Sequence, residues 1–366
     1  MVVGVGSYYH LIGGREPNPT SNWALGQLTS ATASASYFLE WLLYEFHNQD
    51  KPLATVEHLI SAPGGVKDRT GQVQAGEEPT MSALEAACKR WSDRAGSNPE
   101  NIALLYFCGH GISKGRETGL LAADFNDPQF ATLTRNAVHV EKTVQGMWSC
   151  RADNQCFFID SCRGTDAVLQ ETMTSPGRAL IDATNNDIRA NPQPIYFATG
   201  LTQSAHGESN QPSLFTRALV EALNGMAAED EDGTYQAGRC VVNTERLGPA
   251  IRKAMQLSIR RQPWLKGQDC TPDGGGSFPL HFPKGQIKLP LIIGCRPESL
   301  HRRACFTIYA NTKKIDSRAA GVSDESWETR QIPGKYDIEV QLKDGRNDLK
   351  QVLLHPAYKE PTFEFE

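Results

Sequence analysis

The 366-residue sequence lacks any apolar run close to the roughly 20 residues that a membrane-spanning helix requires. Its first ten residues, MVVGVGSYYH, lack the basic start, apolar stretch and cleavage site of a signal peptide. Positive charge is also scarce, since 37 Lys and Arg against 42 Asp and Glu give a net charge of −5. This balance does not predict a basic surface that would bind the phosphate backbone of a nucleic acid. We therefore expect neither a membrane nor a nucleic acid as a partner.

Paired cysteines are missing as well. The nine cysteines are an odd number, and no two of them form a C-x-x-C motif. This argues against a zinc cage and against a framework of disulfides. Free thiols persist in reducing compartments, so the sequence predicts a cytoplasmic protein without a structural metal.

Short apolar runs alternate with amphipathic segments along most of the chain. Runs rich in β-branched or aromatic residues predict strands at 2–5, 55–60, 102–107, 156–159 and 194–199. Apolar residues at three-to-four spacing predict helices over 28–46, 81–91 and 214–223. This alternation favours an α/β fold, in which a mostly parallel sheet carries helices on both faces.

Two stretches depart from the alternation. Residues 164–194 are rich in Gly, Pro and Asn and predict a long mobile excursion. After Phe282, short alternating runs with turn residues between them predict a small β domain that resembles a sandwich. We therefore expect one domain over residues 1–283 and a second over residues 284–366.

A histidine and a cysteine each follow one of the predicted strands. IALLYF runs into CGHG (108–111), and CFFI runs into DSCRG (160–164). Because the carboxyl ends of parallel strands form one ligand-binding edge, His110 and Cys162 should emerge together. Each residue alone is more often structural. The presence of both residues, each with a glycine within two positions, favours Cys162 as a nucleophile and His110 as its base.

These motifs resemble those of the caspase-like cysteine peptidases, which include caspases, metacaspases, paracaspases and gingipains, and in particular the bacterial metacaspase-like members. YFCGHG is similar to the histidine motif and FFIDSCRG to the cysteine motif, and 52 residues separate His110 from Cys162. GLLAADF, FATGLTQSAHGES, LFTRALVEAL and RRQPWLKGQDC extend the resemblance over residues 1–283. Cys108 stands where the family usually has serine.

The resemblance implies a three-layer α/β/α sandwich and peptide-bond hydrolysis by a Cys–His dyad, without a cofactor. His110 would take the proton of Cys162 and return it to the leaving amine. Backbone N–H groups of Gly111 and Cys162 would form the oxyanion hole. Gln203 and Ser204, in the loop after the strand at 194–199, would contact the substrate.

Asp160 precedes Cys162 by two residues and shares its face if the strand continues. A negative neighbour raises the pKa of a thiol, and a buried carboxylate is costly without a cation. In the metacaspase-like branch the equivalent acid lines a pocket for a basic P1 side chain, which implies cleavage after Arg, with Lys second. Two alternatives stay open: Asp160 caps nearby backbone N–H groups, or the enzyme cuts after Asp and uses Arg15 or Arg163.

Two further segments carry specific expectations. If the enzyme prefers basic residues, it can cut itself after Arg178 or Arg189 in the excursion at 164–194, as in the intersubunit linker of caspases. The acidic run AEDEDG (228–233) could bind calcium, as in some metacaspases, but it lacks the ligand spacing of an EF-hand. A solvated turn is the simpler interpretation of that run.

The sequence thus predicts a cysteine endopeptidase that acts on protein substrates, with a small β domain that recruits a substrate or an activator. Resemblance to bacterial relatives implies a role in stress, cell death or antiviral defence. A catalytically inactive scaffold that binds partners is the alternative class, and a cysteine-dependent acyl transferase is a third. The sequence leaves the oligomeric state open.

Overall fold

The computed structural model describes residues 1–18, 24–62, 65–67, 70–74, 76–164, 173–183, 193–200, 208–236 and 238–365. The chain forms two compact units. The first contains Met1–Val220 and Asn243–Leu280, and the second contains Glu221–Val242 and His281–Glu366. The expected boundary at 283/284 lies close to the last change from the first unit to the second, between Leu280 and His281. The return of residues 221–242 to the second unit was not expected from the sequence.

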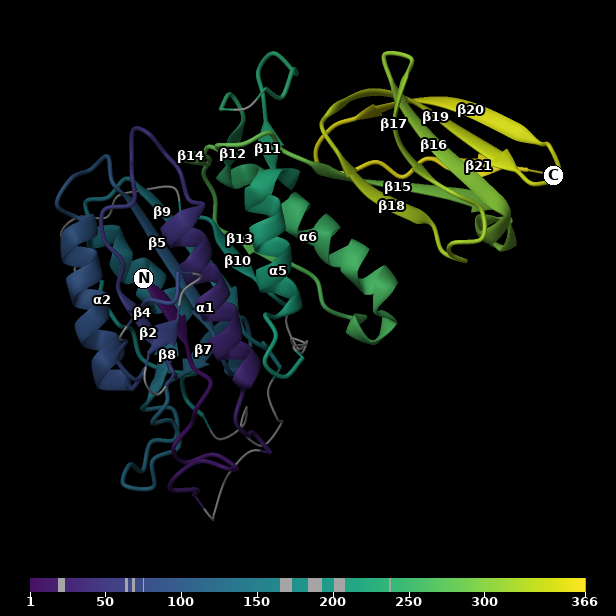
Figure 1. Ribbon diagram of the computed structural model, residues 1–366. Coiled ribbons are helices and arrows are strands. Elements are labelled where there is room, and N and C mark those ends of the chain that lie inside the picture. Colours follow the sequence, from purple (N-terminus) through teal and green to yellow (C-terminus); the bar gives the residue numbers. More distant parts are fainter. Residues whose placement is uncertain are drawn as a thin grey trace. The chain divides into compact units, whose positions relative to one another are not determined.

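A six-stranded sheet forms the centre of the first unit (Figure 1). Its order is β13-β10-β9-β5-β1-β2, with the strands β1 (Val2–Gly4), β2 (His58–Ile60), β5 (Ile102–Cys108), β9 (Asn154–Asp160), β10 (Ile195–Phe197) and β13 (Thr271–Asp273). All neighbours are parallel except the edge strand β13. The mostly parallel sheet is thereby confirmed, although the strand predicted over 55–60 is only three residues long.

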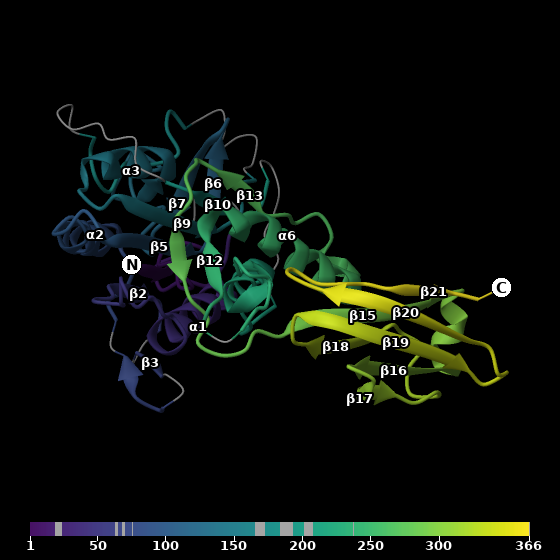
Figure 2. The ribbon, with the colours of Figure 1, turned by 90° about the horizontal axis from the view of Figure 1, so that it is seen from above.

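Helices cover both faces of this sheet, and Figure 2 separates α1 from α2 and α3 across it. The helices of the first unit are α1 (Thr29–Tyr44), α2 (Met81–Ala95), α3 (Val140–Gly146), α5 (Leu214–Glu221) and α6 (Thr244–Arg261). Alternating strand residues face opposite layers. On the α1 side the Phe38 ring stacks on Tyr106 with centroids 4.4 Å apart and meets Phe158 edge-on. On the other side Phe107 and Phe157 share a buried cluster with α2 and α3.

Short elements complete the first unit and its junctions. They are β3 (Val66–Lys67), β4 (Val73–Gln74), the 3-10 helices η1 (Met147–Ser149) and η3 (Pro263–Leu265), the π-helical turn η2 (Ala222–Met226), and the strands β11 (Ala228–Glu229), β12 (Val241–Asn243) and β14 (Pro279–His281).

A three-stranded antiparallel sheet stands beside the central one. It consists of β6 (Gly111–Lys114), β7 (Glu117–Leu121) and β8 (Ala137–His139). Residues 173–183, the described part of the predicted mobile excursion, run along this sheet. Arg178 exchanges backbone hydrogen bonds with Ala137 and His139 at 2.9 and 2.8 Å. At Arg178 this segment is therefore paired with β8 and is not a free loop.

A glycine permits this segment to lie close to α3. A Cβ added to Gly146 would fall 2.0 Å from the carbonyl oxygen of Ile181. Gly146→Ala is therefore expected to lower the free energy of unfolding by about 1–3 kcal/mol, the usual cost of overpacking. Urea titration would measure the effect. Gly275→Ala is the matched control, because no atom lies within 4 Å of a Cβ added there; equal losses in both variants would contradict the contact.

The second unit contains a β-sandwich, as the sequence predicts (Figure 1, green to yellow). One sheet has the order β18-β15-β21 and the other β17-β16-β19-β20. The strands are β15 (Leu289–Arg296), β16 (Ala304–Ala310), β17 (Lys313–Arg318), β18 (Trp327–Gln331), β19 (Gly334–Leu342), β20 (Asn347–Leu354) and β21 (Thr362–Glu364), with the 3-10 helix η4 (Glu298–Arg303) after β15. Phe306, Ile308, Ile338, Val340 and Phe363 are fully buried and supply its core.

The helices were also tested for the capacity to cross a membrane. Within the described residues, none is both long enough and apolar enough to do so.

Candidate active site

The register of the two central strands brings the predicted nucleophile and base together. β5 and β9 run parallel with Cys108 opposite Asp160, and the Gly109 N–H donates to the Asp160 carbonyl at 3.3 Å. His110 and Cys162 each lie two residues beyond this matched pair. Because the two strands are neighbours, about 4.8 Å apart, both residues leave the same edge of the sheet. Cys162 is half-buried, as a thiol that meets a substrate must be.

Gly111 lets the two segments approach each other closely. A Cβ added at this position would lie 2.4 Å from the Cys162 carbonyl oxygen and 2.8 Å from the Ser161 hydroxyl oxygen. Leu121 N–H donates to the His110 carbonyl at 3.0 Å, which makes 110 and 121 the hydrogen-bonded pair of the β6–β7 ladder. The next pair, Gly111 with Leu120, is then of the other type, so the Gly111 N–H points away from β7.

His110 is held at both its ring and its backbone. Its Nε2 lies 2.9 Å from the Gly26 carbonyl oxygen. Since a carbonyl only accepts, Nε2 carries the hydrogen and Nδ1 keeps a lone pair for a proton. The Tyr8 hydroxyl accepts the backbone N–H of His110 at 2.7 Å. Burial lowers the pKa of His110, which favours the neutral, basic form of the imidazole.

Sequence reasoning missed both Gly26 and Tyr8. A backbone carbonyl leaves no residue-type signal, and Tyr8 belongs to the stretch GVGSYYHLIGG, which contains no recognisable motif. Tyr8 reaches His110 from the loop after β1, and Gly26 reaches it from the segment before α1.

Asp160 lies at the end of β9, and its side chain enters a buried polar cluster rather than open solvent. Its Oδ2 accepts the hydroxyls of Ser213 at 2.5 Å, Thr216 at 2.6 Å and Tyr106 at 3.4 Å, and the Cys108 thiol at 3.4 Å. None of these four bonds uses Oδ1. Asp160 is 2% exposed, and burial raises its pKa although the hydrogen bonds oppose the shift. The carboxylate is therefore held by neutral donors.

The cluster ties Asp160 to the first turn of α5. The Ser213 hydroxyl accepts the Thr216 N–H at 3.0 Å while it donates to Asp160. Positive potential at a helix N-terminus stabilises a nearby carboxylate. β9 ends at Asp160, so the strand itself does not extend to Cys162. That Asp160 and Cys162 share a face stays a prediction.

The two arginines of the alternative, Asp-directed pocket have other partners. The Arg15 guanidinium lies 3.5 Å above the Tyr9 ring. That of Arg163 lies 4.0 Å above the Phe197 ring and donates to the Arg116 carbonyl at 3.3 Å. Arg163 is 5% exposed, whereas Arg15 is exposed, so only Arg163 is withdrawn from solvent.

The remaining predicted site residues fall into two groups. Gln203, Ser204 and Arg189 lie outside the described residues. Arg178 is described, and it forms an ion pair with Glu85 at 2.7 Å.

Ala228 and Glu229 of the acidic run form β11, and the residues after them form a turn that side chains close. The Asp230 carboxylate accepts the Thr234 hydroxyl at 3.0 Å, and Asp232 pairs with Arg239. Across the described parts of the chain, no group of three or more His, Cys, Asp or Glu side chains is arranged to hold a metal ion.

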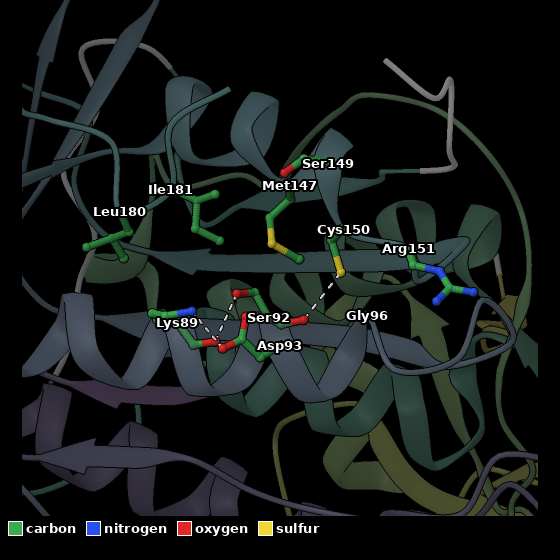
Figure 3. Close-up of a pocket in the computed structure, with 10 residues that line it drawn as sticks. All are labelled: Lys89, Ser92, Asp93, Gly96, Met147, Ser149, Cys150, Arg151, Leu180 and Ile181. Atoms are coloured by element: carbon green, nitrogen blue, oxygen red, sulfur yellow. Dashed lines mark hydrogen bonds and ion pairs between the residues drawn. The ribbon is translucent and has the colours of Figure 1, made fainter. Parts of the chain in front are cut away.

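A pocket of about 460 Å³ lies away from the His110–Cys162 edge (Figure 3). Its walls come from α2, η1 and the returning segment at Leu180 and Ile181. These elements lie near the amino ends of β5 and β9, whereas the dyad lies at their carboxyl ends. In Figure 3 the Lys89–Asp93 ion pair and the bond from Cys150 to the Ser92 carbonyl lie among its lining residues. The pocket contains neither residue of the dyad.

Comparison with known protein families identifies the domain. The caspase domain family matches residues 33–255 of this chain, a span that includes both His110 and Cys162. The chain belongs to the caspase domain family. The expectation of a caspase-like fold is thereby confirmed, and the family assignment supports a peptidase of the caspase clan.

Individual relatives of this caspase-domain protein are distant. The uncharacterized protein y4kE of Sinorhizobium fredii (strain NBRC 101917 / NGR234) is 27% identical over 242 residues, which are 64% of this chain and 67% of that protein. Among solved structures, caspase-1 from Spodoptera frugiperda is similar at 13% identity with a TM-score of 0.41, covering 78% of this chain and 90% of that one. A structure described as a protease has 10% identity and a TM-score of 0.30, covering 90% and 65%.

Proposed function

We propose that this caspase-domain protein is a cysteine endopeptidase that cuts protein substrates with a Cys162–His110 dyad. The observation that supports the proposal is the register of β5 and β9, since His110 and Cys162 each follow the matched pair Cys108 and Asp160 by two residues. The Nε2-protonated ring of His110 leaves Nδ1 to accept the thiol proton. The thiolate attacks the scissile carbonyl, and the imidazolium then protonates the leaving amine. Water hydrolyses the thioacyl intermediate.

The developing oxyanion needs donors that are already in place. The Gly111 N–H points away from β7, and Gly111 lies against the Cys162 backbone. We assign the oxyanion hole to the N–H groups of Gly111 and Cys162. Fixed backbone donors of this kind stabilise a tetrahedral intermediate without reorganisation.

For specificity we propose an arginine at P1, with lysine second. Asp160 is the acid nearest to the nucleophile in sequence, and its Oδ1 takes none of the four bonds that hold Oδ2. An arginine side chain would give this buried carboxylate the cation that its surroundings lack. Gln203 and Ser204 remain proposed substrate contacts. A pocket for an aspartate would have to use Arg15, because Arg163 is buried while Arg15 is exposed.

An acyloxymethyl ketone peptide with arginine at P1 tests the function directly. We expect it to label Cys162, as read by peptide mass mapping, and we expect His110→Ala to lose the labelling. A positional-scanning peptide library would then report the P1 preference. Absence of labelling and of cleavage would favour a catalytically inactive scaffold, and transfer to an added amine instead of water would favour an acyl transferase.

Self-processing is a separate expectation, and the structure bears on one of its two sites. The backbone of Arg178 is paired with β8, and a scissile segment must be released from such pairing before it can enter a protease cleft. We therefore expect active protein to show no cut after Arg178, and any self-cleavage to occur after Arg189. Intact-mass measurement of the parent beside Cys162→Ala would show this. Fragments ending at Arg178 in the parent alone would contradict it.

The cellular setting is proposed from the same resemblance. We infer a cytoplasmic enzyme of a bacterial stress, cell-death or antiviral pathway, with the β-sandwich of the second unit as the part that recruits a substrate or an activator. Nine free cysteines in the described structure agree with a reducing compartment.

A further inference from the structure

Tyr8 connects the first strand of the sheet to the candidate base. It follows β1, is fully buried, and accepts the His110 N–H at 2.7 Å through its hydroxyl. Its ring lies against the imidazole, with centroids 4.9 Å apart and planes tilted by 40°. Burial raises the pKa of Tyr8, and the nearby thiols of Cys108 and Cys162 act in the same direction. The hydroxyl therefore stays neutral and remains an acceptor for the backbone N–H.

Gln27 connects Tyr8 to the residue that holds the imidazole ring. Its Oε1 accepts the Tyr8 N–H at 2.8 Å, and its Nε2 donates to the Tyr8 carbonyl at 3.1 Å and to the Ile12 carbonyl at 2.9 Å. The next residue back along the chain is Gly26, whose carbonyl accepts Nε2 of His110. Main-chain pairing also joins these two loops, because Ile12 forms a β-bridge with Gly26 and its N–H donates to the Leu25 carbonyl at 3.1 Å. The exposed Gln27 side chain adds its three bonds to main-chain atoms at this junction.

We propose that Tyr8 and Gln27 are positioning residues that fix the tautomer and the ring orientation of His110. The proposal rests on the assignment of His110 as the base. Tyr8 sets where the His110 backbone lies, and Gln27 sets where the Gly26 carbonyl lies relative to it. If the carbonyl shifts, the imidazole is free to carry its hydrogen on Nδ1, which removes the lone pair that would take the thiol proton.

The first test compares Tyr8→Phe with the parent in two reactions of Cys162. Tyr8→Phe keeps the ring and removes only the acceptor of the His110 N–H. With a peptide substrate we expect kcat to fall roughly 10- to 100-fold with little change in KM, the scale of a misplaced catalytic group. With iodoacetamide, alkylation of Cys162 at pH 7 should slow by a similar factor. At pH 9.5, where solvent removes the thiol proton without a base, the two rates should converge.

Tyr9→Phe is the matched control. It removes the same atom one residue along the chain, from a ring that packs against Arg15 instead of His110, and should leave both reactions unchanged. Alkylation of Tyr8→Phe at the parent's rate at pH 7 would overturn the proposal. Equal slowing at pH 7 and pH 9.5 would also overturn it, since that result indicates lost access to the thiol instead of a misplaced base.

The second test observes the tautomer itself. In protein with 15N-labelled histidine rings, long-range 15N–1H correlation distinguishes Nε2–H from Nδ1–H, and the His110→Ala spectrum assigns the signal. We expect Nε2–H in the parent and a mixture in Gln27→Met, which keeps the length of the side chain and loses its polar atoms. Gln256→Met, at an exposed position of α6, serves as the control. An unchanged His110 signal in Gln27→Met would overturn the role of Gln27.

These readouts separate the inference from the proposed function. The tautomer and the alkylation rate are measured without a peptide substrate. If the parent cleaves no peptide yet alkylation and tautomer respond as described, the endopeptidase assignment fails while the positioning of His110 stands. If the parent cleaves peptides and neither variant alters His110, the endopeptidase assignment stands while the positioning of His110 by Tyr8 and Gln27 fails.

Discussion

Cys162→Ala is expected to abolish peptide cleavage, and His110→Ala to reduce kcat/KM by roughly 10²- to 10⁴-fold. The first variant removes the atom that forms the thioacyl bond, and the second removes the group that takes and returns the proton, a contribution of about that size in other enzymes. Both side chains lie beyond strand ends and outside the core of the sheet. Thermal unfolding should therefore change little in either variant, so that the lost rate reports chemistry.

Cys305→Ala is the control for this experiment, because Cys305 is the other half-buried free thiol among the described cysteines and lies in the second unit. It should keep the activity of the parent. Turnover that survives in Cys162→Ala would end the assignment of Cys162 as the nucleophile. Loss of activity together with loss of the folded signal would mean that the residue supports the fold and not the reaction.

Asp160→Asn is expected to lower kcat/KM for arginine substrates by roughly 10²-fold or more, the scale of removing one partner of a buried, hydrogen-bonded charge pair. The variant retains an oxygen that can accept the Ser213 and Thr216 hydroxyls. Because burial raises the pKa of Asp160, ionisation of this carboxyl costs folding stability at pH values above its unfolded pKa. Loss of that charge should therefore leave the melting temperature unchanged or higher at pH 7.

The thiol provides the internal control for Asp160→Asn. Removal of a negative neighbour makes a thiol easier to ionise, so iodoacetamide should label Cys162 in the variant at least as fast as in the parent. Slower labelling, or a parent that prefers aspartate at P1, would show that Asp160 does not select the substrate. In that case its four hydrogen bonds would describe its whole role, as the anchor of the first turn of α5.

The parts of the fold that sequence reasoning recovers are those encoded in residue type. The apolar run IALLYF and the run CFFI give β5 and β9, and the residues after them carry the dyad. The C-terminal sandwich follows from alternating runs and turn residues. The strand at 55–60 is shorter than predicted, because only His58–Ile60 pairs with β1 while the preceding residues connect it to α1.

The parts that it misses depend on contacts distant in the sequence. The pairing of Arg178 with β8 joins segments about 40 residues apart, and composition around Arg178 resembles that of a free loop. The buried cluster at Asp160 draws on Ser213 and Thr216, which are 53 and 56 residues away. Hydroxyl residues at the start of a helix are common, so nothing in their type indicates that they hold this carboxylate.

The carbonyl of Gly26 orients the candidate base, and every amino acid has a backbone carbonyl. A Cβ at position 26 would meet only the Ile12 carbonyl oxygen, at an ordinary 3.7 Å, so Gly26→Ala should pass unnoticed in a genetic screen for lost function. Saturation mutagenesis would thus rank position 26 as tolerant although one of its atoms faces the imidazole. Changes that move the main chain, such as a deletion or a circular permutation near position 26, are the ones that would expose this dependence.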